Sequence, residues 1–198
     1  MRKDRLLAFS DGVFAIIITI MVLELKAPHT GDMDEFVKLT PIFGSYVLSF
    51  IYVAIYWNNH HHMLEVVSRI NGATLWANMF LLFWLSLIPF ATAWLGQTHF
   101  ATLPTALYGV VLLMPAIGYS LLQRVLISAH KDNKLLARAV GSDFKGKISL
   151  VMYATGVALA FVKPWLAIIL YALVAVIWFA PDKRIERTVA EHHNQKKA

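Results

Sequence analysis

The chain has 198 residues, of which 58% are hydrophobic and 15% are charged, and its mean hydropathy is +0.59. An ordinary soluble domain is about 45–50% apolar and about 25% charged, so this chain has too few polar residues to cover a water-exposed surface. The absence of cysteine excludes disulfides, thiolate metal sites and cysteine nucleophiles. The composition therefore predicts an integral membrane protein, and the long apolar runs described next make the expected fold all-α.

Six apolar runs match or approach the length of about 20 residues that a membrane helix needs. They are expected at 6–25, 41–57, 73–95, 103–122, 148–162 and 165–180. The last two are short and are separated by Lys163-Pro164, so they form either a hairpin of two spans or one long helix broken at Pro164. The stretch from about Arg124 to Lys147 is partly amphipathic, and we expect it to continue the fourth helix or to lie at the membrane surface.

Lysine and arginine indicate the orientation, because cytoplasmic loops carry an excess of these residues. Fifteen of the 18 basic residues lie at the N-terminus, after the second run, after the fourth run and in the tail. Only Lys26, Lys38 and Lys163 lie on the other side of the predicted spans. Since the fourth loop and the tail are both basic, an even number of crossings separates them. We expect one six-helix membrane domain over 1–198, with both termini in the cytoplasm and a basic cytoplasmic tail at 181–198.

The first run contains a carboxylate, Asp11, which is costly inside a membrane and is expected to face a protein partner. At about 100° per residue, an apolar stripe follows a different side of the same helix. This stripe consists of Phe9, Gly12, Ile16, Thr19, Ile20 and Leu23. Periodicity alone favours packing or lipid contact for the stripe and a structural role for Asp11, with an ion or proton relay as the alternative.

The second run ends in the segment 57–62, Trp-Asn-Asn-His-His-His. Three consecutive histidines diverge around a helix, so we do not expect them to share a metal ion. Asn78 lies in the third run, which starts from the same side of the membrane. The topology therefore places Asp11, His60 and Asn78 at a similar depth and predicts a buried hydrogen-bond cluster that ties the first three helices together.

Motifs for enzyme chemistry are missing, since the sequence contains no G-x-S-x-G, H-E-x-x-H, P-loop or G-x-G-x-x-G. The T-V-G-Y-G filter of K⁺ channels is missing too, so a channel would have to select ions by another device. The basic residues gather at the ends of apolar runs and form no nucleic-acid-binding face. We expect no enzyme activity, no cofactor, no resident metal and no nucleic-acid partner.

Arg5, Phe9, Ser10 and Asp11 form the pattern R-x-x-x-F-S-D near the start of the first membrane helix. This pattern resembles the signature of the transmembrane protein 175 family of lysosomal and bacterial potassium-permeable channels. The resemblance extends to Trp57-x-x-His60, to Asn78 and to the segment 87–90, Leu-Ile-Pro-Phe.

The resemblance implies a potassium-permeable cation channel in the bacterial inner (plasma) membrane, with K⁺ as the permeant ion and lipid as its surroundings. It implies a homotetramer of six-helix subunits, in which helix one lines a central pore. A hydrophobic constriction replaces the carbonyl filter, and it is placed at Ile16, with Thr19, Ile20 and Leu23 further outward. The implied network that supports helix one consists of Arg5, Phe9, Ser10, Asp11, Trp57, His60 and Asn78.

Two other functions remain open at this stage. A proton-coupled secondary transporter would use Asp11 and His60 as its relay, although such carriers often show inverted repeats, and none is evident in this chain. A non-transporting membrane scaffold would carry no ions at all.

Overall fold

The structure is a computed structural model that describes residues 3–28, 31–65, 67, 70–129 and 143–179. In this part of the chain, regular structure is entirely α-helical. The helices are α1 (Lys3–Leu23), α2 (Met33–Lys38), α3 (Thr40–Glu65), α4 (Gly72–Ser86), α5 (Ile88–Gln97), α6 (Thr102–Ala129), α8 (Phe144–Ala160) and α9 (Pro164–Phe179).

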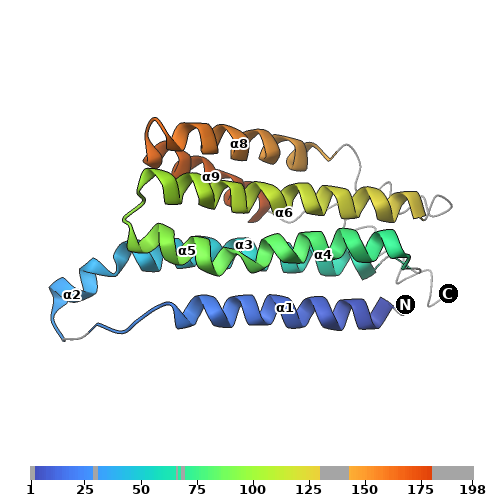
Figure 1. The fold of residues 1–198 in the computed structure, drawn as a ribbon, viewed down its shortest axis with the longest axis horizontal. Helices are drawn as coiled ribbons and strands as arrows, with labels where there is room; N and C mark the ends of the chain where they lie inside the picture. The colour runs from blue at the N-terminus through green and yellow to red at the C-terminus, as the bar shows by residue number, and fades with distance from the viewer. Residues whose placement is uncertain (1–2, 29–30, 66, 68–69, 130–142, 180–198) are drawn as a thin grey trace.

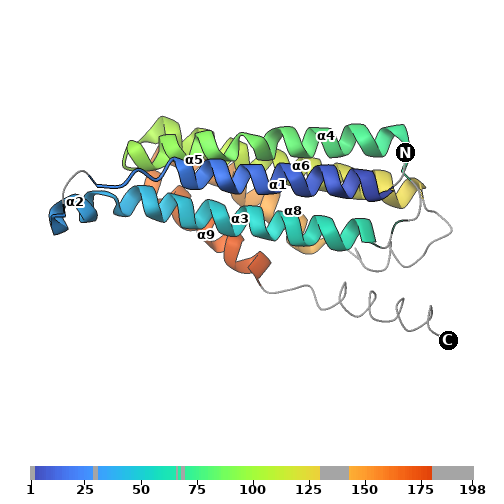
Figure 2. The same cartoon turned by 90° about the horizontal axis from the view of Figure 1, so that it is seen from below.

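The helices lie side by side in layers, with α1 at one edge of the bundle (Figure 1). The next layer contains α3 and the α4–α5 pair, followed by α6, and α8 and α9 lie at the opposite edge. The view turned by 90° shows α1 running between α3 and the α4–α5 pair (Figure 2). Helix α1 packs against α3, α4 and α5. One side of α1 therefore packs against the rest of the bundle, and the other side is left uncovered.

The buried side of α1 follows from a spacing of three or four residues, which brings side chains onto one face of a helix. Its members are Leu6, Ser10, Phe14, Ile17 and Met21. Four of these five side chains are apolar and join the core of the bundle. Ser10 is the one polar member, and its full burial requires a hydrogen-bond partner from a neighbouring helix.

The observed helices differ from the expected second and third runs in where they end. Helix α3 continues past Trp57 to Glu65, so all three consecutive histidines lie on a helix. The third run is two helices, because α4 ends at Ser86 and α5 begins at Ile88. Pro89 lies in the first turn of α5, where it has no N–H to donate and its ring crowds the carbonyl four residues earlier.

The last two runs form a hairpin of two helices, not one long helix broken at Pro164. Helix α8 ends at Ala160, α9 begins at Pro164, and the two helices pack against each other. Tyr171 from α9 fits between α6 and α8 because Gly109 and Gly156 have no side chains there. A Cβ atom added to Gly109 would lie 2.0 Å from the Tyr171 hydroxyl, and one added to Gly156 would lie 2.4 Å from the Tyr171 ring.

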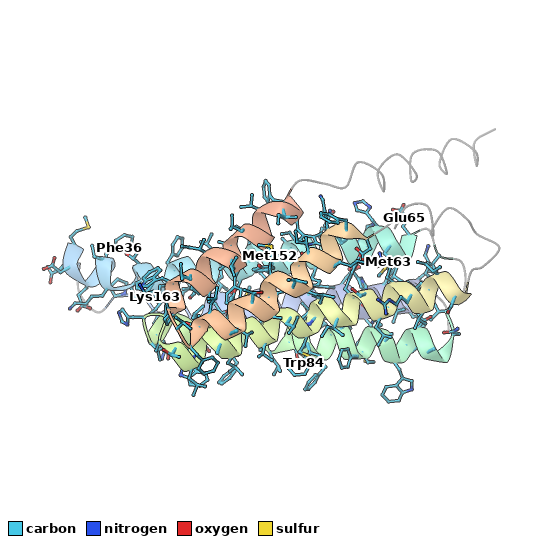
Figure 3. All side chains as sticks on the ribbon, turned by 90° about the horizontal axis from the view of Figure 1, so that it is seen from above. Phe36, Met63, Glu65, Trp84, Met152 and Lys163 are labelled. Atoms are coloured by element: carbon cyan, nitrogen blue, oxygen red, sulfur yellow. The ribbon has the colours of Figure 1, made fainter. Side chains whose placement is uncertain are left out.

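The two ends of the bundle differ in charge. Figure 3 shows Phe36 and Lys163 toward one end and Met63 and Glu65 toward the other. The starts of α1 and α8 and the end of α6 lie at the Glu65 end (Figure 1), and their basic residues are Lys3, Arg5, Arg124, Lys145 and Lys147. The segments at the opposite end carry Lys26, which follows α1, Lys38, which ends α2, and Lys163, which precedes α9. The other basic residues, including Arg69 and those in the expected tail at 181–198, lie outside the described residues, as does most of the stretch between 124 and 147. Helix α6 continues to Ala129, seven residues beyond the expected end of the fourth run.

Four stretches of the described chain are long and apolar enough to cross a membrane: α1, α3, the α4–α5 pair and α6. Helix α9 is apolar but shorter, with 16 residues, and α8 has 17.

Candidate pore helix and its supporting network

The uncovered side of α1 carries the stripe that the sequence pattern singled out. Ile16 is 57% exposed and Leu23 is 77% exposed, so neither side chain is packed inside the bundle. Phe9, Gly12, Thr19 and Ile20 are also exposed on this side. An apolar surface of this kind on one chain needs lipid or another protein chain to cover it.

Two small residues shape this uncovered side. A Cβ atom added to Gly12 would meet nothing within 4 Å inside the subunit. Thr19 donates its hydroxyl hydrogen to the backbone carbonyl of Ile16 at 2.9 Å. This bond satisfies the donor and leaves the oxygen lone pairs available on the uncovered side of the helix. The stripe therefore has one polar acceptor among its apolar members.

The opposite, buried side of α1 is held by a chain of hydrogen bonds across three helices. Asn78 on α4 donates its Nδ2–H to the Ser10 hydroxyl on α1, at 3.1 Å. Its Oδ1 lies 2.7 Å from Nε2 of His60 on α3. An amide oxygen can only accept, so His60 carries its proton on Nε2 and donates it. All three side chains are fully buried, and the ring of Phe14 lies against that of His60, with 5.6 Å between centroids.

Asp11 makes a separate contact. Trp57 on α3 donates its indole Nε1–H to Oδ1 of Asp11 at 3.0 Å. The charge on the acceptor strengthens a hydrogen bond of this type. Trp57 is exposed and Asp11 is half-buried, so this bond lies at the margin of the subunit and not in its core.

The expected cluster of Asp11, His60 and Asn78 is corrected by this geometry. Ser10, and not Asp11, completes the buried chain with Asn78 and His60. The reason is the 100° turn between neighbouring residues on a helix. The buried stripe on which Ser10 lies directs its side chain into the bundle, and Asp11 is then directed to the edge.

Two members of the implied network lie outside these contacts. Arg5 and Phe9 are both exposed, on the uncovered side of α1. At the same end of the helix, Lys3 donates from Nζ to the backbone carbonyl of Glu65 at 2.8 Å. This bond joins the start of α1 to the end of α3.

A second polar layer, which the sequence analysis did not single out, joins α3, α5 and α6 in the other half of the bundle. Thr92 donates to the Ser49 hydroxyl at 2.6 Å, and Ser49 lies 2.9 Å from the Tyr108 hydroxyl. Ser45 donates to the Thr92 backbone carbonyl at 3.3 Å. The sequence feature that could have predicted this layer is the pair Ser45 and Ser49. These two residues are four apart in an apolar run and so share a helix face. No group of three or more His, Asp or Glu side chains in the described chain is placed to hold a metal ion.

Comparison with known proteins identifies the class of protein that has this arrangement. Residues 5–89 match the family described as Endosomal/lysosomal potassium channel TMEM175. A protein from Chryseobacterium that is named a potassium channel is 53% identical over 192 residues, which cover 97% of this chain and 100% of that protein. A Chamaesiphon minutus protein, also named a potassium channel, is 30% identical over 191 residues, 89% of this chain and 92% of that one.

A solved structure agrees with these sequence matches. It is the crystal structure of a lysosomal potassium-selective channel TMEM175 homolog from Chamaesiphon minutus, with a TM-score of 0.78 and 27% identity. The match covers 91% of this chain and 97% of that chain. The fold and the apolar helices are those of a multi-pass membrane protein in a class of channels, not of enzymes. The chain belongs to the TMEM175 family.

Proposed function

We propose that this chain is a potassium-permeable cation channel in which α1 from each of four identical subunits lines a shared central pore. The observation that carries the proposal is the one-sided packing of α1, whose uncovered face is apolar and lies at the edge of the bundle (Figure 1). A closed ring of identical subunits covers that face without leaving an open end. The relatives that are named potassium channels support the same function.

The constriction lies at Ile16 in this proposal. Four copies of this side chain around an axis form an apolar collar, which closes by expelling water. Thr19, Ile20 and Leu23 follow further outward. The Thr19 oxygen, whose hydrogen is already donated to the helix backbone, is suited to replace part of the hydration shell of a cation. Without a carbonyl filter, the preference for K⁺ over Na⁺ is modest.

The hydrogen bonds on the other side of α1 keep its rotation fixed. Asn78 and His60 hold Ser10 inside the subunit, and Trp57 holds Asp11 at the edge. Because a helix is rigid over two turns, these contacts also set the direction in which Ile16 points. Asp11 and Ser10 act in this proposal as structural groups, not as ion ligands.

In the proposed topology, six helices cross the bacterial inner membrane and both termini are cytoplasmic. The basic Glu65 end of the bundle lies on the cytoplasmic side, as the distribution of lysine and arginine favours. The short helices α8 and α9 cross by local thinning of the bilayer. At the outer end, Glu24, Asp32, Asp34 and Glu35 raise the local concentration of cations near the mouth.

The decisive variant is Ile16→Asn, measured as K⁺ flux into liposomes that contain the purified protein. An amide keeps the collar wet, and we expect flux to rise about ten-fold, the change that corresponds to lowering the barrier by ~1.4 kcal/mol. Ile169→Asn is the matched control, because Ile169 is 53% exposed on α9 at the opposite edge of the bundle. Unchanged flux through an intact Ile16→Asn tetramer would contradict the placement of the constriction.

The same preparation separates the proposed channel from its rivals. A proton-coupled carrier predicts a saturating flux with steep dependence on the proton gradient, whereas a channel predicts single-channel steps. Asp11 and His60 bond to different partners, Trp57 and Asn78, which does not favour a direct relay between them. A scaffold predicts no flux of K⁺, Rb⁺, Cs⁺, Na⁺ or H⁺ at all.

A further inference from the structure

His61 belongs to the histidine run, but the hydrogen-bond network of α1 does not include it. Its imidazole stacks on the indole of Trp57, four residues earlier on α3, with 6.0 Å between centroids and 29° between planes. That indole is the one that donates its N–H to Asp11 on α1. His61 is therefore one contact removed from the pore helix.

The contacts of the His61 ring are mainly those of an aromatic ring, not of a hydrogen-bonding group. Its Nδ1 is buried and has no hydrogen-bond partner in the described chain. The edge of the His62 ring lies near it, at 5.8 Å and 70°. His62 itself is directed toward Glu65, with 3.9 Å between Nδ1 and the carboxylate. The stack on Trp57 is thus the contact through which His61 can reach α1.

Trp57 needs a packing contact, such as this ring stack, to keep its indole in one orientation. The side chain is 44% exposed in the subunit, so the bundle leaves much of the indole without packing. An indole that is free to turn about its two side-chain torsions directs its N–H toward Asp11 only part of the time. Offset-stacked rings contribute free energy beyond the area that they bury, and they restrict these torsions.

We propose that His61 is a positioning residue for the pore helix: by stacking on Trp57 it keeps the Nε1–H directed at Asp11 and so restrains the rotation of α1. The inference rests on the proposed channel function, since the effect is felt at Ile16. Asp11 precedes Ile16 by five residues, about 7.5 Å along the helix axis. A change in rotation at Asp11 is therefore transmitted to the collar through less than two turns of helix.

The test is a double-substitution cycle at His61 and Trp57, measured as K⁺ flux of tetramers in liposomes. His61→Ala removes the stack, and we expect flux to fall about five-fold, because α1 is less well held in its conducting rotation. His61→Phe keeps a flat ring and is expected to restore flux to within about two-fold of the unsubstituted protein. Trp57→Phe removes the N–H, so adding His61→Ala to it is expected to change nothing further. Asn58→Ala, at an exposed neighbouring position, is the control and leaves flux unchanged.

Several results would overturn the inference. Flux of His61→Ala equal to that of Asn58→Ala would do so, as would an equal loss from His61→Ala with and without Trp57→Phe. Failure of His61→Phe to restore flux would show that the ring plane is not what matters. If the unsubstituted protein itself carries no K⁺, the proposed function fails instead. The same four proteins are then compared by the melting temperature of the tetramer. If the losses from His61→Ala and Trp57→Phe simply add in the double variant, the proposed coupling between the two residues is refuted.

Discussion

Asn78→Leu tests the buried hydrogen bonds that join Asn78 to Ser10 and His60 and so hold α1. The substitution keeps a side chain of similar size but removes both hydrogen-bonding groups of the amide. His60 then has a buried N–H without an acceptor, and Ser10 loses the donor that reaches it from α4. Both residues are fully buried, so water cannot replace the lost partner without opening the contact between α1, α3 and α4.

The expected loss of stability follows from the two broken bonds. Interhelical hydrogen bonds in a membrane protein average about 0.6 kcal/mol each, so losing two of them is expected to cost about 1.2 kcal/mol. A buried polar group left without a partner costs about 1–3 kcal/mol in other proteins. We expect a loss of about 2 kcal/mol per chain, which for a chain of this size lowers the melting temperature by roughly 4–8 °C.

The assay is thermal unfolding of the detergent-purified protein, followed by far-ultraviolet circular dichroism and by size-exclusion chromatography of the proposed tetramer. Asn58→Leu, at an exposed position on α3, is the control for the change of residue type. Asn78→Leu leaves the polar groups of Ser10 and His60 buried without a partner, and adding Ser10→Ala removes one of them. The double variant is therefore expected to recover part of the lost stability, because replacing both partners of a hydrogen bond is less harmful than replacing one. A melting temperature of Asn78→Leu within 1 °C of the control would refute the reasoning, and so would strict additivity with Ser10→Ala.

Two further predictions concern the packing of α3. Gly96→Ala is expected to lower the free energy of unfolding by about 1–3 kcal/mol, because the new Cβ would lie 2.6 Å from the Ser45 hydroxyl and 2.7 Å from the Ile42 Cα. Gly44→Ala, whose Cβ would meet nothing within 4 Å in the subunit, is the control, and equal melting temperatures would contradict the close approach. Tyr108→Phe removes the hydroxyl bonded to Ser49 and is expected to cost about 0.6–1 kcal/mol with K⁺ flux within two-fold of normal. A large change of flux at an unchanged melting temperature would show that this polar layer belongs to the conduction path.

Much of the architecture could be predicted from the order of apolar and polar residues. Composition indicated a helical membrane protein, and the side of α1 that carries Ile16 and Leu23 was separable from the side that carries Ser10 by helical periodicity alone. Periodicity relates residues on one helix to each other, but it does not say which side meets a neighbouring helix. The spacing of Ser10 and Asp11 was therefore certain, while their partners were not.

The three-dimensional packing decided those partners. Placing α1 between α3 and the α4–α5 pair directs Ser10 to Asn78 and leaves Asp11 for Trp57. The polar layer of Ser49, Thr92 and Tyr108 was not predicted for a similar reason, since its members come from three helices far apart in the sequence. Hydrogen bonds of this kind depend on the relative rotation and height of whole helices, which arise from the sum of many side-chain contacts.

By itself, the sequence determined that this chain belongs in lipid, where its apolar runs lie, and which face of the first helix is apolar. Those properties depend on residue type and on the 3.6-residue turn of the helix, and both are local. Only the tertiary structure decided that this apolar face is the one that the rest of the bundle leaves uncovered. The physical reason is that burial is a property of neighbours: Ile16 and Ile17 are equally hydrophobic, and the position of α1 at the edge of the bundle makes one exposed and the other part of the core.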